Sequence, residues 1–209
     1  MVNYSVDTAE REVIYSALAL VSAVTVSFLS SFRDAQLYQL TAPSALMIFI
    51  LLISIYDSLI WKISSRLGIS SIPDLNGNWE GKLEKTNGDS YPVSLHVSQS
   101  WRKIQVSLDT SVTVGSLQIC GMFISDKNRP VVKWVYSVRP RHFALEEGYN
   151  PSGEGVNEFR IINLTGEQIL DGSYYSSHFR GGKVVFHRSR EKKEAFINNT
   201  KTIKKANSQ

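Results

Sequence analysis

The chain contains little of what catalysis or metal binding would need. It has a single cysteine, Cys120, so it can form no internal disulfide and offers no second thiolate to a metal. Its four histidines are scattered without the spacing of metal ligands. The sequence also lacks a nucleophile elbow and a glycine-rich phosphate loop that opens a helix. We therefore expect no catalytic residues, no metal and no cofactor, and we expect a binding protein rather than an enzyme.

Charge is missing from two long segments near the start of the chain. Residues 13–32 and 37–56 carry no charged side chain, and Arg33 and Asp34 lie between them. A helix of about 20 apolar residues is long enough to cross the roughly 30 Å hydrocarbon layer of a bilayer. We predict a transmembrane helical hairpin over 1–68, with spans at about 13–32 and 37–58. The alternative is a buried helical hairpin in the core of a soluble protein.

The residues that flank the spans indicate their depth and orientation. Asp57 lies near the end of the second run beside Trp61 and Lys62, which favours a position at the level of the lipid headgroups over a pore or a proton relay. Arg11, Lys62 and Arg66 flank the outer ends of the spans, whereas Arg33 is alone in the turn. The positive-inside rule then predicts a multi-pass protein with both termini in the cytoplasm.

After a linker at 69–75, the sequence changes to an alternation of apolar and polar residues, which is typical of β-strands. We predict an all-β domain over 76–189 with eight strands, at about 77–84, 93–98, 104–108, 112–124, 131–138, 156–164, 168–176 and 182–189. Tight turns join most of them, so the pattern favours a small eight-stranded antiparallel meander β-barrel, or else a small sandwich. Gly115 and Gly121 predict a bulge or sharp coiling in the fourth strand. Residues 190–209 form a basic, flexible tail that an anionic membrane surface would attract weakly.

Trp79 is predicted to be a core residue. It shares a strand face with Gly77 and Gly81, and a large side chain between small ones fits the narrow base of a barrel. Arg160 lies on one face with Glu158 and Ile162; if that face is interior, its charge must be paired or bind a ligand, because burying it alone is very unfavourable.

Aromatic side chains lie close to arginines at two places in the β domain. Trp134 and Tyr136 lead along one strand to Arg139 and Arg141, and a second tyrosine-rich strand leads to another arginine. Arginine binds phosphate and aromatic rings stack on bases, so these residues suit a nucleotide pocket. The predicted ligand-binding residues are Trp134, Tyr136, Arg139, Arg141, Arg160, Tyr174, Tyr175 and Arg180. A half-exposed strand with a solvated charged rim would give the same pattern, and that alternative stays open.

Two stretches carry a resemblance to a known family. They are residues 74–81 (DLNGNWEG), which open the β domain, and residues 170–174 (LDGSY) near its end. Together with two short-looped membrane helices ahead of an all-β domain, they resemble the two-transmembrane, β-strand-rich effectors of bacterial CBASS antiphage systems. The resemblance covers the chain from Glu12 to Arg188.

The resemblance implies a minimal β-barrel that senses a cyclic di- or oligonucleotide made by a partner nucleotidyltransferase, with that nucleotide as activating ligand. It further implies a homo-oligomer of ligand-bound protomers whose helices disrupt the bacterial inner membrane and kill the infected cell. We expect the lipid bilayer to be a partner, and we expect no DNA or RNA partner. The alternative functions are a membrane-tethered, lipocalin-like carrier for a lipid and a docking domain for a protein partner.

Overall fold

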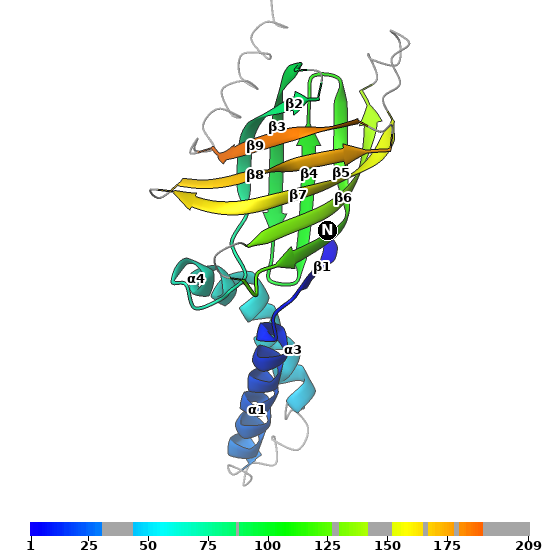
Figure 1. The fold of residues 1–209 in the computed structure, drawn as a ribbon. Helices are drawn as coiled ribbons and strands as arrows, with labels where there is room; N and C mark the ends of the chain where they lie inside the picture. Colours follow the sequence, from blue (N-terminus) through cyan, green and yellow to red (C-terminus); the bar gives the residue numbers. More distant parts are fainter. Residues whose placement is uncertain are drawn as a thin grey trace, which may run out of the picture.

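The computed structural model describes residues 1–30, 44–86, 88–126, 130–141, 152–164, 167–177 and 180–189. Two apolar helices project from one end of a closed β-barrel (Figure 1). We call the barrel end next to the helices the proximal end and the opposite end the distal end. The predicted turn between the spans and the predicted basic tail lie outside the described residues.

Two helical segments are long and apolar enough to cross a membrane. The first is α1 (Glu10–Ser30); the second is α3 (Ala45–Ile55), which continues through a π-helical turn, η1 (Tyr56–Ile60), into α4 (Trp61–Arg66). Their apolar windows have a mean hydropathy of 2.0, and only 6% and 11% of these windows are buried within the protein. The core helix of a soluble protein would be mostly buried, so these exposed apolar faces favour the membrane hairpin over the soluble alternative.

The hydroxyl groups within the helices bond to their own backbone. Thr25 Oγ1 donates to the carbonyl of Val21 at 2.7 Å, and Ser54 Oγ donates to the carbonyl of Ile50 at 2.8 Å. Ser44 caps α3, since its side chain accepts from the N–H of Met47 at 3.2 Å. These bonds satisfy polar groups that hydrocarbon would leave without a partner, as we expect for serine and threonine in a membrane helix.

Eight strands follow one another as antiparallel neighbours and account for most of the barrel. They are β2 (Gly77–Lys85), β3 (Ser90–Gln99), β4 (Lys103–Asp109), β5 (Thr113–Phe123), β6 (Val131–Pro140), β7 (Gly153–Leu164), β8 (Glu167–Ser176) and β9 (Arg180–Arg188). Pairing of β9 with β2 closes the sheet. A register shift interrupts β5 between Leu117 and Ile119, so a bulge is present in the predicted strand but lies between Gly115 and Gly121 rather than at either glycine.

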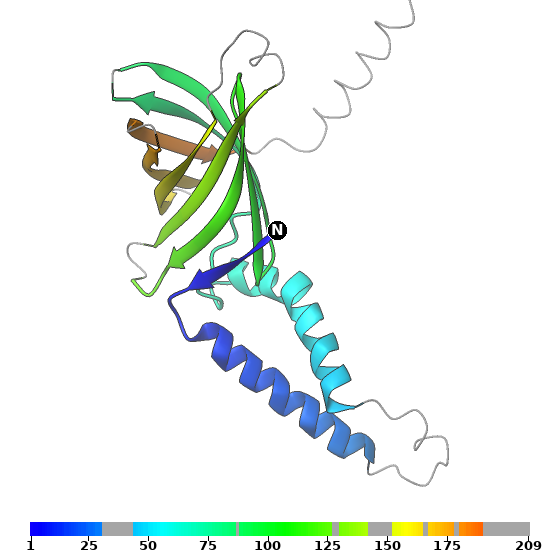
Figure 2. The same cartoon turned by 90° about the vertical axis from the view of Figure 1, so that its right-hand side faces the viewer.

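Over the described residues the barrel has nine strands, so the prediction of eight in a purely antiparallel meander was wrong. The ninth strand, β1 (Val2–Val6), precedes the helices and pairs antiparallel with β4 and parallel with β5. Strands β4 and β5 pair directly toward the distal end, and β1 is inserted between them at the proximal end, where it crosses the base of the barrel (Figure 2). Its alternation of Val2, Tyr4 and Val6 with polar residues is only five residues long, and these residues fall within the segment 1–68 that we predict as the helical hairpin.

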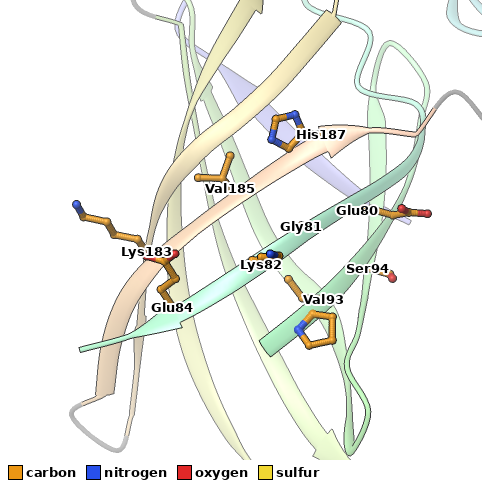
Figure 3. A pocket seen from close by; sticks show the side chains of 10 residues that line it. Glu80, Gly81, Lys82, Glu84, Val93, Ser94, Lys183, Val185 and His187 are labelled. Atoms are coloured by element: carbon orange, nitrogen blue, oxygen red, sulfur yellow. The ribbon is translucent and has the colours of Figure 1, made fainter. Parts of the chain in front are cut away.

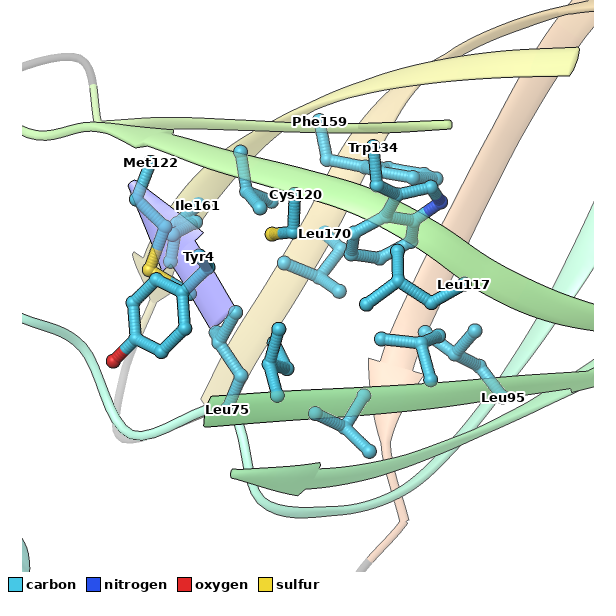
Figure 4. Close-up of a cluster of buried hydrophobic side chains, with 14 of the residues drawn as sticks. Tyr4, Leu75, Leu95, Leu117, Cys120, Met122, Trp134, Phe159, Ile161 and Leu170 are labelled. Atoms are coloured by element: carbon cyan, nitrogen blue, oxygen red, sulfur yellow. The ribbon is translucent and has the colours of Figure 1, made fainter. Parts of the chain in front are cut away.

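Large side chains fill the interior of the barrel (Figure 4). Trp79 is fully buried and its indole N–H donates to the carbonyl of Leu75 at 3.0 Å, so its predicted core position is confirmed. The ring of Phe159 lies 4.8 Å from that of Trp134 and 5.7 Å from that of Phe186, measured between centroids. Burial of these faces provides most of the driving force for closing the barrel.

Candidate functional site

The packed interior leaves almost no free space. The cavity in its centre, beside Leu117, Trp134 and Tyr136, has a volume of about 10 Å³. That is room for about one water molecule. A nucleotide or a lipid chain cannot enter this cavity without displacing core side chains, so within the described residues an end of the barrel or its outer face is the better place for a small-molecule site.

A network of polar side chains closes the proximal end. Gln99 accepts from the N–H of Leu75 at 2.9 Å and donates to the hydroxyl of Tyr4 at 3.3 Å. Arg188 donates to Gln168 Oε1 at 3.1 Å and to the backbone carbonyl of Asn76. These donors and acceptors satisfy one another, although the same end carries an open polar pocket of about 500 Å³ that Arg66, Asp74 and Arg188 line.

Two tyrosines and two glycines line the upper interior toward the distal end. A Cβ atom on Gly155 would lie 2.4 Å from the hydroxyl of Tyr136, and one on Gly182 would lie 2.7 Å from the ring of Tyr174. Glycine at these two positions leaves room for the tyrosine side chains and for the close approach of the neighbouring strands. The rings thereby form an aromatic floor, with the packed core beneath it and the distal rim above it.

The floor presents neutral hydroxyl groups. Burial, with a smaller contribution from the nearby Tyr174, raises the pKa of Tyr136 to about 12. At neutral pH the phenol therefore stays protonated and can donate a hydrogen bond. A floor of this kind suits the face of a nucleobase or the hydroxyl of a sugar.

Arg141 lies on the rim at the same end, immediately after β6. Its Nη2 donates to Asp109 Oδ1 at 2.8 Å and its Nε donates to the carbonyl of Thr110 at 3.3 Å. The side chains of Arg141 and Asp109 remain 39% and 48% exposed, so solvent or a ligand can reach both. A phosphate can compete with this carboxylate for the guanidinium, because both anions match its forked geometry.

The structure separates the other predicted site residues. Arg139 is exposed on the outer face of β6, and Arg180 begins β9 at the distal end, where its backbone alone is described. Trp134 is 2% exposed and belongs to the core, whereas Tyr175 is 62% exposed on the outer face of β8. Arg160 is exposed on the outer face of β7, so it needs no buried partner. Tyr136, Tyr174 and Arg141 are thus the predicted residues that line the interior or rim of the distal half.

A second concave surface lies on the outer face of β2, β3 and β9 (Figure 3). This outer groove has a volume of about 730 Å³. Two lysines and a histidine, Lys82, Lys183 and His187, line it together with Glu80 and Glu84. Glu84 is the cross-strand partner of Lys183. Because the carboxylates oppose the lysines, the groove is less suited to a dianionic ligand than to a partner with charges of both signs.

No motif in the sequence indicates the outer groove. Its charged residues alternate with core residues in the way that solvated strand faces do, and their convergence results from the coiling of three strands. Neither place resembles a metal centre: among the described residues, no three His, Cys, Asp or Glu side chains converge in a group that could hold an ion.

A family model matches residues 70–188, which is more than half of the 209-residue chain. Its description is Cap15, cyclic dinucleotide receptor domain. The matched range includes the linker and strands β2–β9, and it leaves out β1 and both apolar helices. A search of curated proteins finds no match.

Proposed function

Because the chain belongs to the Cap15 family of cyclic dinucleotide receptors, which are CBASS effectors, we propose that its barrel binds a cyclic dinucleotide at the distal end. The family match carries this proposal, since it covers the barrel strands that hold the aromatic floor and Arg141. In this arrangement a base or ribose rests on Tyr136 and Tyr174, and a phosphate binds Arg141. Arg139 and Arg180 extend the positive charge of the rim.

Three observations support the distal end over the other surfaces. The interior cavity of about 10 Å³ is too small for any nucleotide. In the proximal pocket, Arg188 is already bonded to Gln168 and to the carbonyl of Asn76, and Asp74 would face a phosphate there. The outer groove is large enough, but a ligand with two phosphates would face Glu80 and Glu84 there.

Ligand binding is tested by thermal unfolding of the full chain in detergent micelles, with a panel of cyclic di- and trinucleotides. The full chain is required because a truncation at residue 73 would remove β1 from the barrel. A nucleotide at 100 times its dissociation constant adds about 2.7 kcal/mol to the free energy of unfolding. We expect a rise in melting temperature with at least one cyclic dinucleotide, and a flat response to the whole panel would refute the proposal.

Charge reversal on the rim locates the site. A hydrogen bond to a charged group contributes about 1.5–3 kcal/mol, so Arg141→Glu should weaken the binding by roughly 10- to 150-fold or more. Lys82→Glu, in the outer groove, is the matched control and should bind like the wild type. If Lys82→Glu loses affinity while Arg141→Glu and Arg139→Glu keep it, the ligand binds in the outer groove. The melting temperature without ligand shows whether each variant is folded.

We further propose that ligand-bound protomers assemble and that their helices then disrupt the inner membrane. The barrel and both termini lie in the cytoplasm, where a partner nucleotidyltransferase makes the signal during phage infection. A ligand drives assembly only if it binds the assembled form better than the free protomer. The exposed apolar faces of α1 and α3 support the membrane position, because soluble monomers rarely expose large contiguous apolar surfaces.

Dye release from vesicles tests this second step. Full-length protein in vesicles of phosphatidylethanolamine and phosphatidylglycerol should release an entrapped dye when the stabilising nucleotide is added, and sedimentation should show a larger species. If the nucleotide binds but causes neither dye release nor assembly, the protein is a receptor that does not act by disrupting the membrane. A lipid carrier, the alternative from sequence, would need an internal cavity far larger than the one beside Trp134.

A further inference from the structure

The turn between β3 and β4 inserts a tryptophan between the two apolar helices. Trp101 is fully buried there. Its ring lies 5.2 Å from that of Tyr15 on α1 and 4.9 Å from that of Tyr56 on η1, in edge-to-face arrangements at 64° and 75°. The two helices are apart next to the barrel and converge toward their other ends (Figure 2). Trp101 therefore occupies the place where closer packing of the helices would otherwise begin.

Each helix also binds this turn through a charged side chain. Arg11 of α1 donates to the carbonyl of Trp101 at 2.8 Å and to that of Tyr4 at 2.6 Å. Asp57 of η1 accepts from the N–H of Arg102 at 2.9 Å and from its guanidinium at 3.4 Å. We call Arg11, Tyr15, Tyr56, Asp57, Trp101 and Arg102 the Trp101 junction.

The Trp101 junction is not optimally packed. Within the part of the chain that the structure describes, Trp101 Nε1 and Arg11 Nε are buried without a hydrogen-bond partner. The π-helical turn η1 lies at the same level, and Asp57 is part of it. π-helical turns are frequent at functional sites, and a buried donor without a partner would gain a hydrogen bond in another arrangement.

Strand β4 connects this junction with the proposed nucleotide site. Arg102, which binds Asp57, immediately precedes the strand, and Asp109, which binds Arg141, ends it. The strand has 7 residues, which corresponds to about 23 Å of extended chain. An anion that takes Arg141 away from Asp109 therefore acts directly on the strand whose other end is fixed to the helices.

We propose that the Trp101 junction is the coupling element between nucleotide binding and the membrane helices. In the unliganded protein, Arg11 and Asp57 hold Trp101 between the helices and keep them apart. A nucleotide phosphate on Arg141 releases Asp109, β4 shifts, and the turn withdraws from the helices, which become free to pack differently. This inference rests on the proposed function, and it assigns Asp57 the role of a positioning residue that holds the closed state.

The variant Asp57→Asn tests this proposal in the full chain, because it removes the charge and keeps the shape. Its matched control is Glu12→Gln, which neutralises an exposed carboxylate in the first turn of α1. Both variants and the wild type are placed in dye-filled vesicles of phosphatidylethanolamine and phosphatidylglycerol. Release is followed without nucleotide and with cyclic di-AMP, cyclic di-GMP or cyclic GMP–AMP. Melting temperatures with the same three nucleotides report binding separately.

We expect Asp57→Asn to release dye without nucleotide at least tenfold faster than the wild type, and to show the wild-type nucleotide-induced shift in melting temperature. Glu12→Gln should stay closed. Wild-type behaviour of Asp57→Asn would overturn the proposal, and so would a complete loss of release, because the junction would then be needed for the open state. A wild type that binds none of the nucleotides refutes the proposed function instead, while nucleotide-independent release by Asp57→Asn still reports on the junction.

Discussion

The two ends of the barrel differ in how tightly their side chains are packed and in how far they are exposed. At the proximal end, fully buried Trp79 donates to the carbonyl of Leu75, buried Gln99 accepts from the N–H of Leu75, and Arg188 donates to Gln168. Strand β1, from the N-terminus, completes the sheet there. At the distal end, glycines leave space beside two tyrosines, and Arg141 remains partly exposed. A receptor needs a rigid base and an accessible rim; here the side chains around Trp79 and Gln99 form the rigid base, and the less completely bonded Trp101 junction lies between this base and the helices. The comparison predicts that stability resides at the proximal end and ligand recognition at the distal end.

The largest effect should come from truncating the proximal tryptophan. Trp79→Ala removes a fully buried side chain together with its hydrogen bond to Leu75, and such substitutions cost about 3–5 kcal/mol of unfolding free energy. Tyr91→Ala, at the distal end where the ring is 41% exposed, should cost under about 1 kcal/mol. Denaturant unfolding of the full chain in detergent measures both. Equal losses would show that the two ends contribute alike to stability.

Most of the strands could be predicted from the sequence, because each hairpin is local and the alternation marks its faces. The expected strand at 168–176 differs by one residue from β8 (Glu167–Ser176). Strand β1 could not be predicted in this way, since its partners Ile104 and Cys120 lie about a hundred residues away and nothing in five residues identifies them. Long-range pairing is visible only in three dimensions.

The candidate site was only partly predictable, for a related reason. Alternation shows that Trp134 and Tyr136 share a face, and the structure confirms that both point inward. It does not show depth, so Trp134 in the core and Tyr136 nearer the rim look alike in sequence. Nor does it distinguish an inner face from an outer one, which is why Arg160 was a candidate. The position of Trp101 between the helices has no sequence signal at all.

Removal of a buried polar side chain should cost less stability than removal of Trp79, and the cost should differ between the two ends. Gln99→Leu leaves the N–H of Leu75 and the carbonyl of Pro73 without their partner, at a cost of about 1–3 kcal/mol. At the distal end, Thr113→Val removes one hydrogen bond between the hydroxyl groups of Thr113 and Thr110, at 2.7 Å, and should cost about 1 kcal/mol. Thermal unfolding of both variants, with the wild type as reference, gives the ranking. A larger loss for Thr113→Val would reverse the assignment of the rigid end.

The smallest expected effect is a loss of stability at low pH through Asp7, which lies between β1 and α1. Desolvation of the Asp7 carboxylate would raise its pKa, but hydrogen bonds from the Ser125 side chain and from the N–H groups of Ile124 and Ser125 together lower it below the ordinary 3.8. A carboxyl with a lowered folded-state pKa adds stability above its unfolded pKa, and this stability disappears as the pH falls through the folded value. The wild type should therefore lose stability below about pH 4 partly through Asp7.

Replacing that carboxylate isolates its share. Asp7→Asn should be less stable than the wild type at pH 7, by under about 1 kcal/mol because the site is solvent-exposed, and the difference should shrink below pH 4. Melting temperatures of the two proteins between pH 7 and pH 3 measure this convergence. Asp7 joins the end of β1 to the β5–β6 connection. If the melting temperatures of the two proteins do not converge as the pH falls, this link contributes nothing to the rigid base. Strand β1 is then held by strand pairing and Tyr4 alone.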